Sequence, residues 1–157
     1  NKRIREFVIA IDTSGSCQGE MVHRFLNKAY SVLKNEGSYF EQINIHIIQC
    51  DCRIQEDVKI TSDEEFDRYM EDIQLKGFGG TDFRPVFEHV DMLIKRNEFT
   101  DLKGLIYFTD GDGTYPETMP DYRVAFIFVD DTMHVPKVPT WAIRLVLHEN
   151  EVGGRIK

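Results

Sequence analysis

The stretch that decides the fold is FVIAIDTSGS, residues 7–16. Its first five residues form an unbroken apolar run, which predicts a central strand buried on both faces, as in a parallel sheet. The run ends at Asp12, and the hydroxyls of Ser14 and Ser16 follow on the next turn. One carboxylate and two hydroxyls close together are hard oxygen ligands of the kind that bind Mg²⁺. The stretch therefore predicts a buried strand with a metal site beyond its carboxyl end.

Helical and strand patterns alternate along the rest of the chain. The first helix is expected to bury an apolar stripe made of Val22, Phe25, Leu26, Ala29, Val32 and Leu33. A second helix is expected after the capping box of Ser62 and Glu65, and a third near Phe83 with Asp82 as its cap. Further strands are expected at residues 43–48, 54–60, 105–108, 124–129 and 142–147. This alternation predicts an α/β fold with a doubly wound, Rossmann-like sheet of about six strands.

Loop lengths indicate how the strands connect. The turn before residues 54–60 is too short for a parallel crossover, so this strand is expected at an antiparallel edge of a mostly parallel sheet. If the strand order is 3-2-1-4-5-6, the winding reverses between the first and fourth strands, and ligands bind beyond their carboxyl ends. Asp12 and Asp110 follow those two strands. Thr81, in the glycine-rich loop before the third helix, can reach the same edge, so three separate segments are expected to meet there.

Size and composition agree with one globular domain spanning residues 1–157. The net charge of −8 argues against general nucleic-acid binding, and no apolar run approaches the ~20 residues of a membrane span. The cysteines, Cys17, Cys50 and Cys52, are an odd number, which favours reduced thiols in a cytoplasmic protein. The first residue is Asn1 rather than Met, so we expect the chain to be the C-terminal part of a longer protein.

Three short motifs together resemble the metal-ion-dependent adhesion site (MIDAS) of von Willebrand factor A (VWA) domains. They are residues 12–16 (DTSGS), 80–82 (GTD) and 109–111 (TDG). The resemblance implies that Ser14, Ser16 and Thr81 contact a cation, with Asp12 and Asp110 bound directly or through water. It implies Mg²⁺, or else Mn²⁺ or Ca²⁺, and a partner protein that offers an Asp or Glu to the ion.

More narrowly, the chain resembles a bacterial VWA-like family of unknown function found C-terminal to a metallopeptidase-like domain. That likeness implies contacts with the protein's own N-terminal domain and with a MoxR-type AAA+ ATPase. The chain departs from the fuller VWA pattern after Asp110, where the connections are short and contain prolines. We therefore expect the late helices to be reduced, leaving an apolar sheet face that the N-terminal part or a partner covers.

Two other functions remain open at this point. A Mg²⁺ ion with a bound water could hydrolyse phosphate esters, as in a metal-dependent hydrolase. Haloacid-dehalogenase-like phosphatases, however, need a second Asp two positions after the first, and this chain has Ser14 there. The cation could also be purely structural. A binding module without catalytic residues is the interpretation that the motifs favour.

Overall fold

The computed structural model describes residues 4–15, 19–35, 42–109, 111–129 and 136–147. Within them the strands are β1 (Ile4–Asp12), β2 (Gln42–Cys50), β3 (Ile54–Ile60), β4 (Leu102–Thr109), β5 (Arg123–Val129) and β6 (Ile143–Leu147). The helices are α1 (Gly19–Asn35), α2 (Asp63–Glu71) and α3 (Arg84–Lys95). The strands form one six-stranded sheet, so the predicted α/β class is confirmed.

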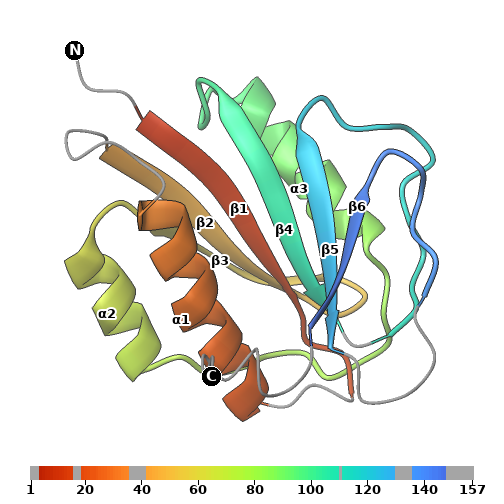
Figure 1. Cartoon of the computed structure of the whole chain (residues 1–157), viewed down its shortest axis with the longest axis horizontal. Coiled ribbons are helices and arrows are strands. Elements are labelled where there is room, and N and C mark those ends of the chain that lie inside the picture. The colour runs from red at the N-terminus through yellow and green to blue at the C-terminus, as the bar shows by residue number, and fades with distance from the viewer. Residues whose placement is uncertain (1–3, 16–18, 36–41, 110, 130–135, 148–157) are drawn as a thin grey trace.

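The strand order is β3-β2-β1-β4-β5-β6, which is the order on which the predicted site depends. All neighbouring strands are parallel except β2 and β3, so β3 is the expected antiparallel edge strand. The carboxyl ends of the parallel strands lie along the lower edge of the sheet in Figure 1, and the segment joining α2 to α3 runs along this edge. The winding reverses between β1 and β4, where the sequence predicts the site.

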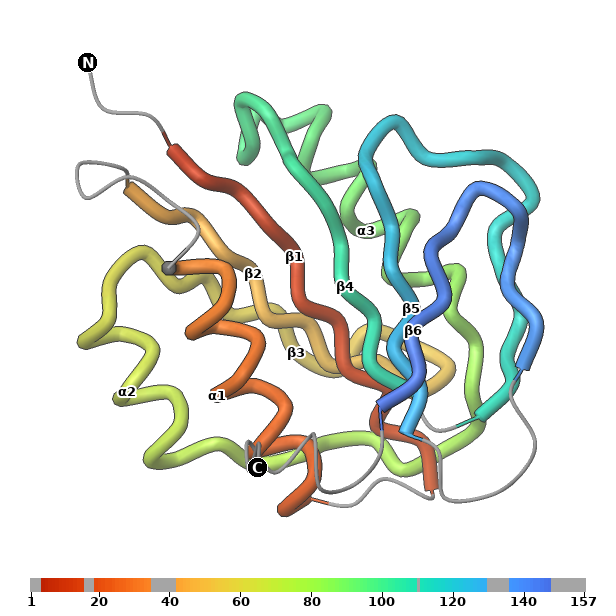
Figure 2. The backbone as a smooth tube through the Cα atoms, in the orientation of Figure 1, coloured from red at the N-terminus to blue at the C-terminus, as the bar shows by residue number. Residues whose placement is uncertain are grey.

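The central strand β1 is buried from both sides. Residues 8–11 have no exposed surface, because α1 and α2 cover one face of the sheet and α3 covers the other (Figure 2). No helix joins β4 to β5 or β5 to β6 in the described parts of those connections. The expectation that the late helices are reduced is therefore confirmed for the described residues.

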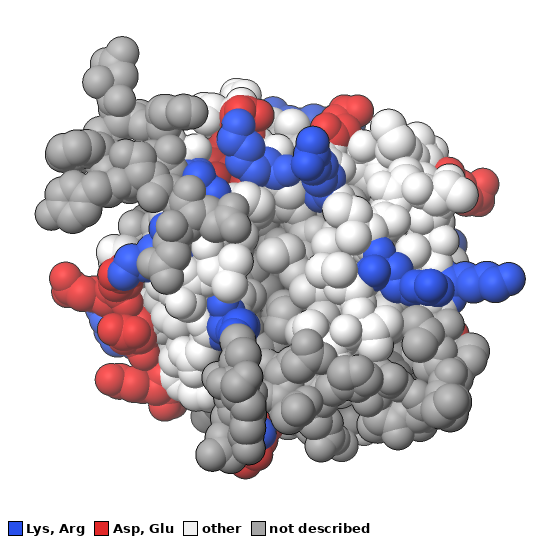
Figure 3. Space-filling view, viewed as in Figure 1, with Lys and Arg blue, Asp and Glu red and all other residues white. Residues whose placement is uncertain are grey.

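Acidic side chains gather on the side of the molecule that carries α2, at the left of Figure 3. They include Asp63, Glu64, Glu65, Asp67 and Glu71. This agrees with the solvated, charged face that the α2 sequence indicates. Among the described residues, no helix has both the length and the apolar character that crossing a membrane requires.

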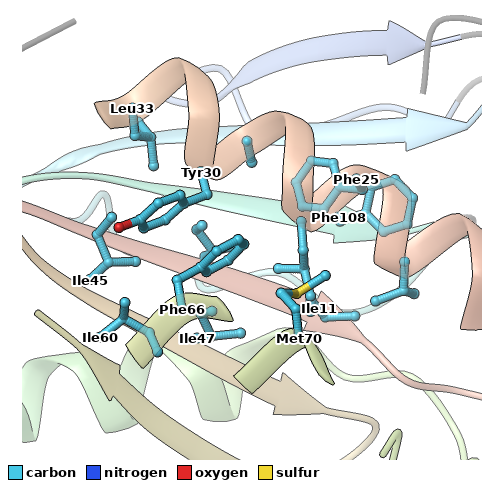
Figure 4. Close-up of a cluster of buried hydrophobic side chains, with 14 of the residues drawn as sticks. Ile11, Phe25, Tyr30, Leu33, Ile45, Ile47, Ile60, Phe66, Met70 and Phe108 are labelled. Atoms are coloured by element: carbon cyan, nitrogen blue, oxygen red, sulfur yellow. The ribbon is translucent and has the colours of Figure 1, made fainter. Parts of the chain in front are cut away.

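Two aromatic pairs hold α1 on the sheet and on α2 (Figure 4). Phe25 stacks on Phe108 of β4 with ring centroids 4.3 Å apart, and Tyr30 stacks on Phe66 of α2 at 3.9 Å. The prediction that Val32 belongs to this core is wrong, because its side chain is 45% exposed. Tyr30 is buried instead, because α2 packs on that flank of α1, whereas Val32 lies on the opposite flank.

The helix starts match the predictions in part. The Ser62 hydroxyl caps α2 by accepting the Glu65 N–H at 3.2 Å, but the Glu65 carboxylate accepts from the N–H of Thr61 rather than from that of Ser62. Asp82 is not the cap of α3. The capping position is Phe83, and the Asp82 carboxylate accepts the Arg84 N–H at 3.0 Å from one residue further out.

A charged network surrounds the buried His46 on β2. Its Nδ1 lies 2.8 Å from Asp57 Oδ1 and its Nε2 lies 3.0 Å from Glu98 Oε2, so both nitrogens can donate only when the ring is protonated. His89 also contacts Asp57, and Lys59 contacts Glu98. Burial opposes the charge on His46, but the hydrogen bonds and charges of Asp57 and Glu98 prevail and raise its pKa above 6.5. His46 is thus a hydrogen-bonded residue, as its position on a strand suggests.

We expect the free energy of unfolding to fall as the pH rises above about 6.5 and through the raised folded-state pKa of His46. Because the folded-state pKa of His46 is raised, its stabilisation is complete below the unfolded pKa of about 6.5 and is lost as the pH rises through the folded-state pKa. Urea denaturation at a series of pH values measures this slope. His46→Gln should flatten it and His23→Gln, an exposed control on α1, should not; an equal slope in both variants would contradict the assignment.

Candidate metal centre

The loop that carries Thr81 is held against the end of β1 by backbone hydrogen bonds. The Phe78 N–H donates to the Thr13 carbonyl at 2.8 Å, and the Gly15 N–H donates to the Gly79 carbonyl at 3.0 Å. These two bonds run in opposite directions and join segments more than sixty residues apart in sequence. The loop between α2 and α3 therefore lies beside the Asp12–Ser14 turn, as the topology predicts.

Asp12 is buried at the end of β1, with 5% of its surface exposed. Its Oδ1 accepts the Ser14 N–H at 2.9 Å, and its Oδ2 accepts the Thr109 hydroxyl at 2.5 Å. The second bond ties the end of β1 to the end of β4. Thr109 directly precedes Asp110, so this bond anchors the strand end from which Asp110 follows.

Thr81 is half-buried and lies against the segment that follows β4. A Cβ built on Gly113 would come within 2.9 Å of Thr81 Cγ2, and the Phe83 N–H donates to the Thr114 carbonyl at 3.1 Å. Asp12, Ser14 and Thr81 thus belong to segments that meet at one edge of the sheet. Ser16 and Asp110, the other predicted ligands, lie outside the described residues.

Side-chain oxygens close the turns at this edge by accepting the N–H two residues further on, which is the geometry of Asx and Ser/Thr turns. Asp12 accepts from Ser14, Asp51 from Arg53, Asp82 from Arg84 and Thr109 from Gly111. The same local chemistry therefore shapes the ends of β1, β2 and β4 and the start of α3. These turns orient the oxygens by bonds within each segment, before any ligand is present.

Asp51 is a site residue that the motif analysis did not single out. It is 3% exposed, and its Oδ2 accepts the Gly79 N–H at 3.0 Å while its Oδ1 accepts the Arg53 N–H and the Gln55 side-chain amide at 3.0 Å each. Its backbone carbonyl also accepts the Asp82 N–H at 3.2 Å. Asp51 therefore holds the Thr81 loop from both sides. The sequence did contain a signal for Asp51, since this carboxylate directly follows β2, much as Asp12 ends β1.

Phe78 stands on the rim of the same edge with 51% of its surface exposed and a φ of 65°. Bulky residues rarely adopt this left-handed conformation, which costs about 1–2 kcal/mol. Phe83, the other aromatic residue that flanks the glycine loop, is fully buried in the core. Of the two, Phe78 is the one available to a binding partner.

The donor chemistry at this edge fits a hard cation. Asp12, Ser14 and Thr81 provide only carboxylate and hydroxyl oxygens, which Mg²⁺, Mn²⁺ and Ca²⁺ prefer. Burial, with help from the charges of Asp51 and Asp12, raises the pKa of the nearby Cys50 thiol to about 12, so it stays protonated. No group of three or more His, Cys, Asp or Glu that could hold a metal occurs within the described residues, so hydroxyls would have to complete the coordination.

Comparison with known families and structures agrees with this architecture. The profile of a family described as "VWA-like domain (DUF2201)" matches residues 7–148. The VWA domain of SpRpn10 has a similar structure, with 11% identity, a TM-score of 0.58 and coverage of 96% of this chain and 92% of that one. An aerotolerance-related membrane protein from Bacteroides fragilis gives 14% identity, a TM-score of 0.59 and coverage of 96% and 95%.

A third similar structure is that of proximal thread matrix protein 1 from the mussel byssus with a zinc-occupied MIDAS motif. It shares 13% identity at a TM-score of 0.62 over 98% of this chain. This chain spans less than half the length of that protein, 46% in this structure and 43% in another crystal form. At these identities the likeness concerns the fold. No curated protein sequence gives a significant match.

Proposed function

Because this chain belongs to the VWA-like domain family DUF2201, we propose that it is a divalent-cation-dependent protein-binding module rather than an enzyme. The ligand set we propose is Asp12, Ser14, Ser16, Thr81 and Asp110. The hydroxyls bind the ion directly, and the two carboxylates bind it directly or through water. Mg²⁺ is the proposed ion, with Mn²⁺ or Ca²⁺ as substitutes.

The observation that carries the proposal is the bonding around Asp12. Its two oxygens reach Ser14 on the same turn and Thr109 at the end of β4, and the Thr81 loop is bonded to Thr13 and Gly15 beside it. Residues from three segments are thus held together by protein contacts alone. A bound divalent ion would supply an electrophilic position for a partner's carboxylate, because a mostly neutral ligand set leaves its charge poorly compensated.

The chain's own residues also favour a protein partner. Phe78 exposes an aromatic ring on the rim beside Gly15, and aromatic side chains are enriched at the centres of protein interfaces. The partner we propose therefore offers an Asp or Glu to the ion and an apolar group to Phe78. A MoxR-type AAA+ ATPase or the protein's own N-terminal region, in a bacterial cytoplasmic complex, is the form that the family resemblance suggests.

Calorimetry with Mg²⁺ and Mn²⁺ tests the metal site, and water-proton relaxation of bound Mn²⁺ tests whether a carboxylate can reach it. We expect one ion to bind per chain. Ser14→Ala should weaken binding at least about tenfold, or ~1.4 kcal/mol, while Ser31→Ala on the exposed surface of α1 should not. Acetate, and a peptide containing Glu, should displace water from bound Mn²⁺ and lower the relaxation enhancement.

Two results would contradict the proposal. If the metal binds tightly but neither acetate nor the Glu peptide lowers the relaxation enhancement of bound Mn²⁺, the cation is purely structural. Mg²⁺-dependent hydrolysis of a generic phosphoester that is lost in Ser14→Ala would indicate an enzyme.

A further inference from the structure

The two faces of the sheet are covered unequally. On the α3 side, residues of β4 and β5 such as Tyr107, Val124 and Phe126 are buried. On the α1 side, α1 and α2 lie over β1, β2 and β3, and no described helix lies over β5 and β6 (Figures 1 and 2). We call the surface over β4–β6 beside α1 the open sheet face. Its residues are Val32, Ile106, Ala125, Ile143 and Leu145.

The open sheet face is apolar and accessible. Ile143 is 52% exposed, Leu145 is 46% exposed and Val32 is 45% exposed. They are three of the six exposed large hydrophobic residues in the described part of the chain, and they come from two separate elements. Ile106 and Ala125, which lie between α1 and β6 on this side, are only partly buried. Clustered exposed apolar side chains of this kind mark an interaction surface.

The flank of α1 that borders this surface is the one turned away from α2. His23, Tyr30 and Lys34 contact α2 or its first turn, and Val32 and Lys28 lie about half a helical turn away from that flank. Phe25 reaches β4 through its stack on Phe108. Val32 therefore forms one wall of the open sheet face, and Ile143 and Leu145 of β6 form the other.

The dimensions suit one α-helix. Neighbouring strands lie about 4.8 Å apart, so β4, β5 and β6 span about 10 Å. Packed helices lie 8–10 Å apart, so one additional helix beside α1 would cover these strands. Doubly wound sheets are normally covered by helices on both faces.

Basic side chains border the open sheet face, although the chain has a net charge of −8. Arg5 and Arg123 stand at the amino ends of β1 and β5 on this side, and the Arg5 guanidinium lies 5.9 Å from the centre of the Phe7 ring. Lys28 projects from the bordering flank of α1. Figure 3 shows Lys and Arg side chains above and on either side of an uncharged area. Acidic side chains also appear at the upper margin and at the upper right, and a larger acidic group lies further left over α2.

We propose that the open sheet face binds an amphipathic α-helix of a partner protein. The apolar side of that helix packs on Val32, Ile143 and Leu145. Acidic side chains on its edges pair with Arg123 and Lys28. This surface is separate from the metal centre, which lies at the carboxyl ends of the strands, so binding there does not require a cation.

The test uses two helical, hydrocarbon-stapled peptides of about 16 residues, a length of about 24 Å. Both carry Leu at the i, i+3, i+4 and i+7 positions, and one has Glu and the other Lys along the flanks. We expect the Glu peptide to bind at least tenfold more tightly at low salt and equally well with EDTA. Methyl NMR should place the shifts at Val32, Ile106, Ile143 and Leu145.

Variants separate this surface from nonspecific apolar binding. Leu145→Glu and Arg123→Glu should each weaken binding of the Glu peptide at least tenfold. Met119→Glu is the control and should leave the binding unchanged, because Met119 is a 65% exposed apolar residue in the β4–β5 connection, away from this surface. Thermal melts check that each variant folds. If the Glu and Lys peptides bind with equal affinity, the proposal of an acidic partner helix is wrong. If a proline-containing, non-helical peptide binds as tightly as the Glu peptide, the surface instead adds a strand at β6, which also contradicts the proposal.

Two further outcomes would assign the surface to another occupant and overturn the proposal. The first is a concentration-dependent dimer that Leu145→Glu dissociates, which would indicate a second copy of the chain. The second is a loss of amide protection in β6 when residues 148–157 are deleted, which would indicate that the chain covers its own surface.

Discussion

Replacing Asp12 with asparagine is expected to weaken Mg²⁺ binding by about 100-fold, which corresponds to about 2.7 kcal/mol. The substitution removes the negative charge that faces the ion, and a pair of unit charges about 4 Å apart is worth about 4 kcal/mol even at an effective dielectric constant of 20. It also disturbs the turn. Asp12 accepts hydrogen bonds on both oxygens, from Ser14 and Thr109, whereas asparagine has only one accepting oxygen and so keeps an acceptor for only one of them.

Calorimetry and thermal melts together separate this effect from loss of folding. Wild type should be stabilised by about 2.7 kcal/mol when Mg²⁺ is present at 100 times its Kd, and Asp12→Asn should lose most of that gain. In EDTA the two proteins should differ little, because the variant loses hydrogen bonds but no longer buries a carboxylate without a cation. Asp101→Asn is the matched control, since Asp101 is 71% exposed at the opposite edge of the sheet. If Asp12→Asn binds Mg²⁺ as tightly as wild type, the metal does not bind at this edge of the sheet and the proposed site is wrong.

Two features of the strand order could be predicted because local features of the sequence dictate them. The apolar run at residues 7–11 has no polar face, so it must be a central strand, and the short turn before Ile54 forces β3 to pair antiparallel with β2. The rule that ligands bind where the winding reverses then brings Asp12 to the same edge as Thr109 and the loop of Thr81. This part of the site follows from chain connectivity.

Contacts between distant segments could not be predicted in the same way. Asp51 follows a strand and was detectable as an edge carboxylate, but its bond to Gly79 joins residues 28 positions apart and depends on the path of the loop. Val32 fits the helical periodicity of α1 as well as its buried neighbours do. Its exposure depends on which flank α2 covers, and Tyr30 stacking on Phe66 reveals that only in the folded chain.

Asp51→Asn is expected to weaken Mg²⁺ binding about tenfold although Asp51 is not a proposed ligand. Burial opposes its charge, but hydrogen bonds from Gln55, Arg53 and Gly79 prevail and hold the pKa of Asp51 below its usual value. Asparagine offers only one accepting oxygen. One of the two backbone N–H groups, of Arg53 or Gly79, would then face an NH₂ group, and a bond to a charged acceptor is worth about 1.5–3 kcal/mol. Hydrogen exchange should report faster opening at Gly79, and calorimetry should report the loss of affinity.

Two neighbouring glycines provide a matched test of the same contact. A Cβ at Gly79 would lie 2.8 Å from Asp51 Oδ2, whereas a Cβ at Gly80 would meet no described heavy atom within 4 Å. Gly79→Ala must therefore displace the loop or the Asp51 carboxylate, and it should lower Mg²⁺ affinity as Asp51→Asn does. Gly80→Ala lowers the conformational entropy of the unfolded chain by the same amount and lies one residue closer to Thr81. It should leave the Mg²⁺ affinity within about twofold of wild type. If both alanine variants bind Mg²⁺ equally well, the position of the Thr81 loop does not depend on Asp51. This follows because, of the two added methyl groups, only the one at position 79 contacts the Asp51 carboxylate.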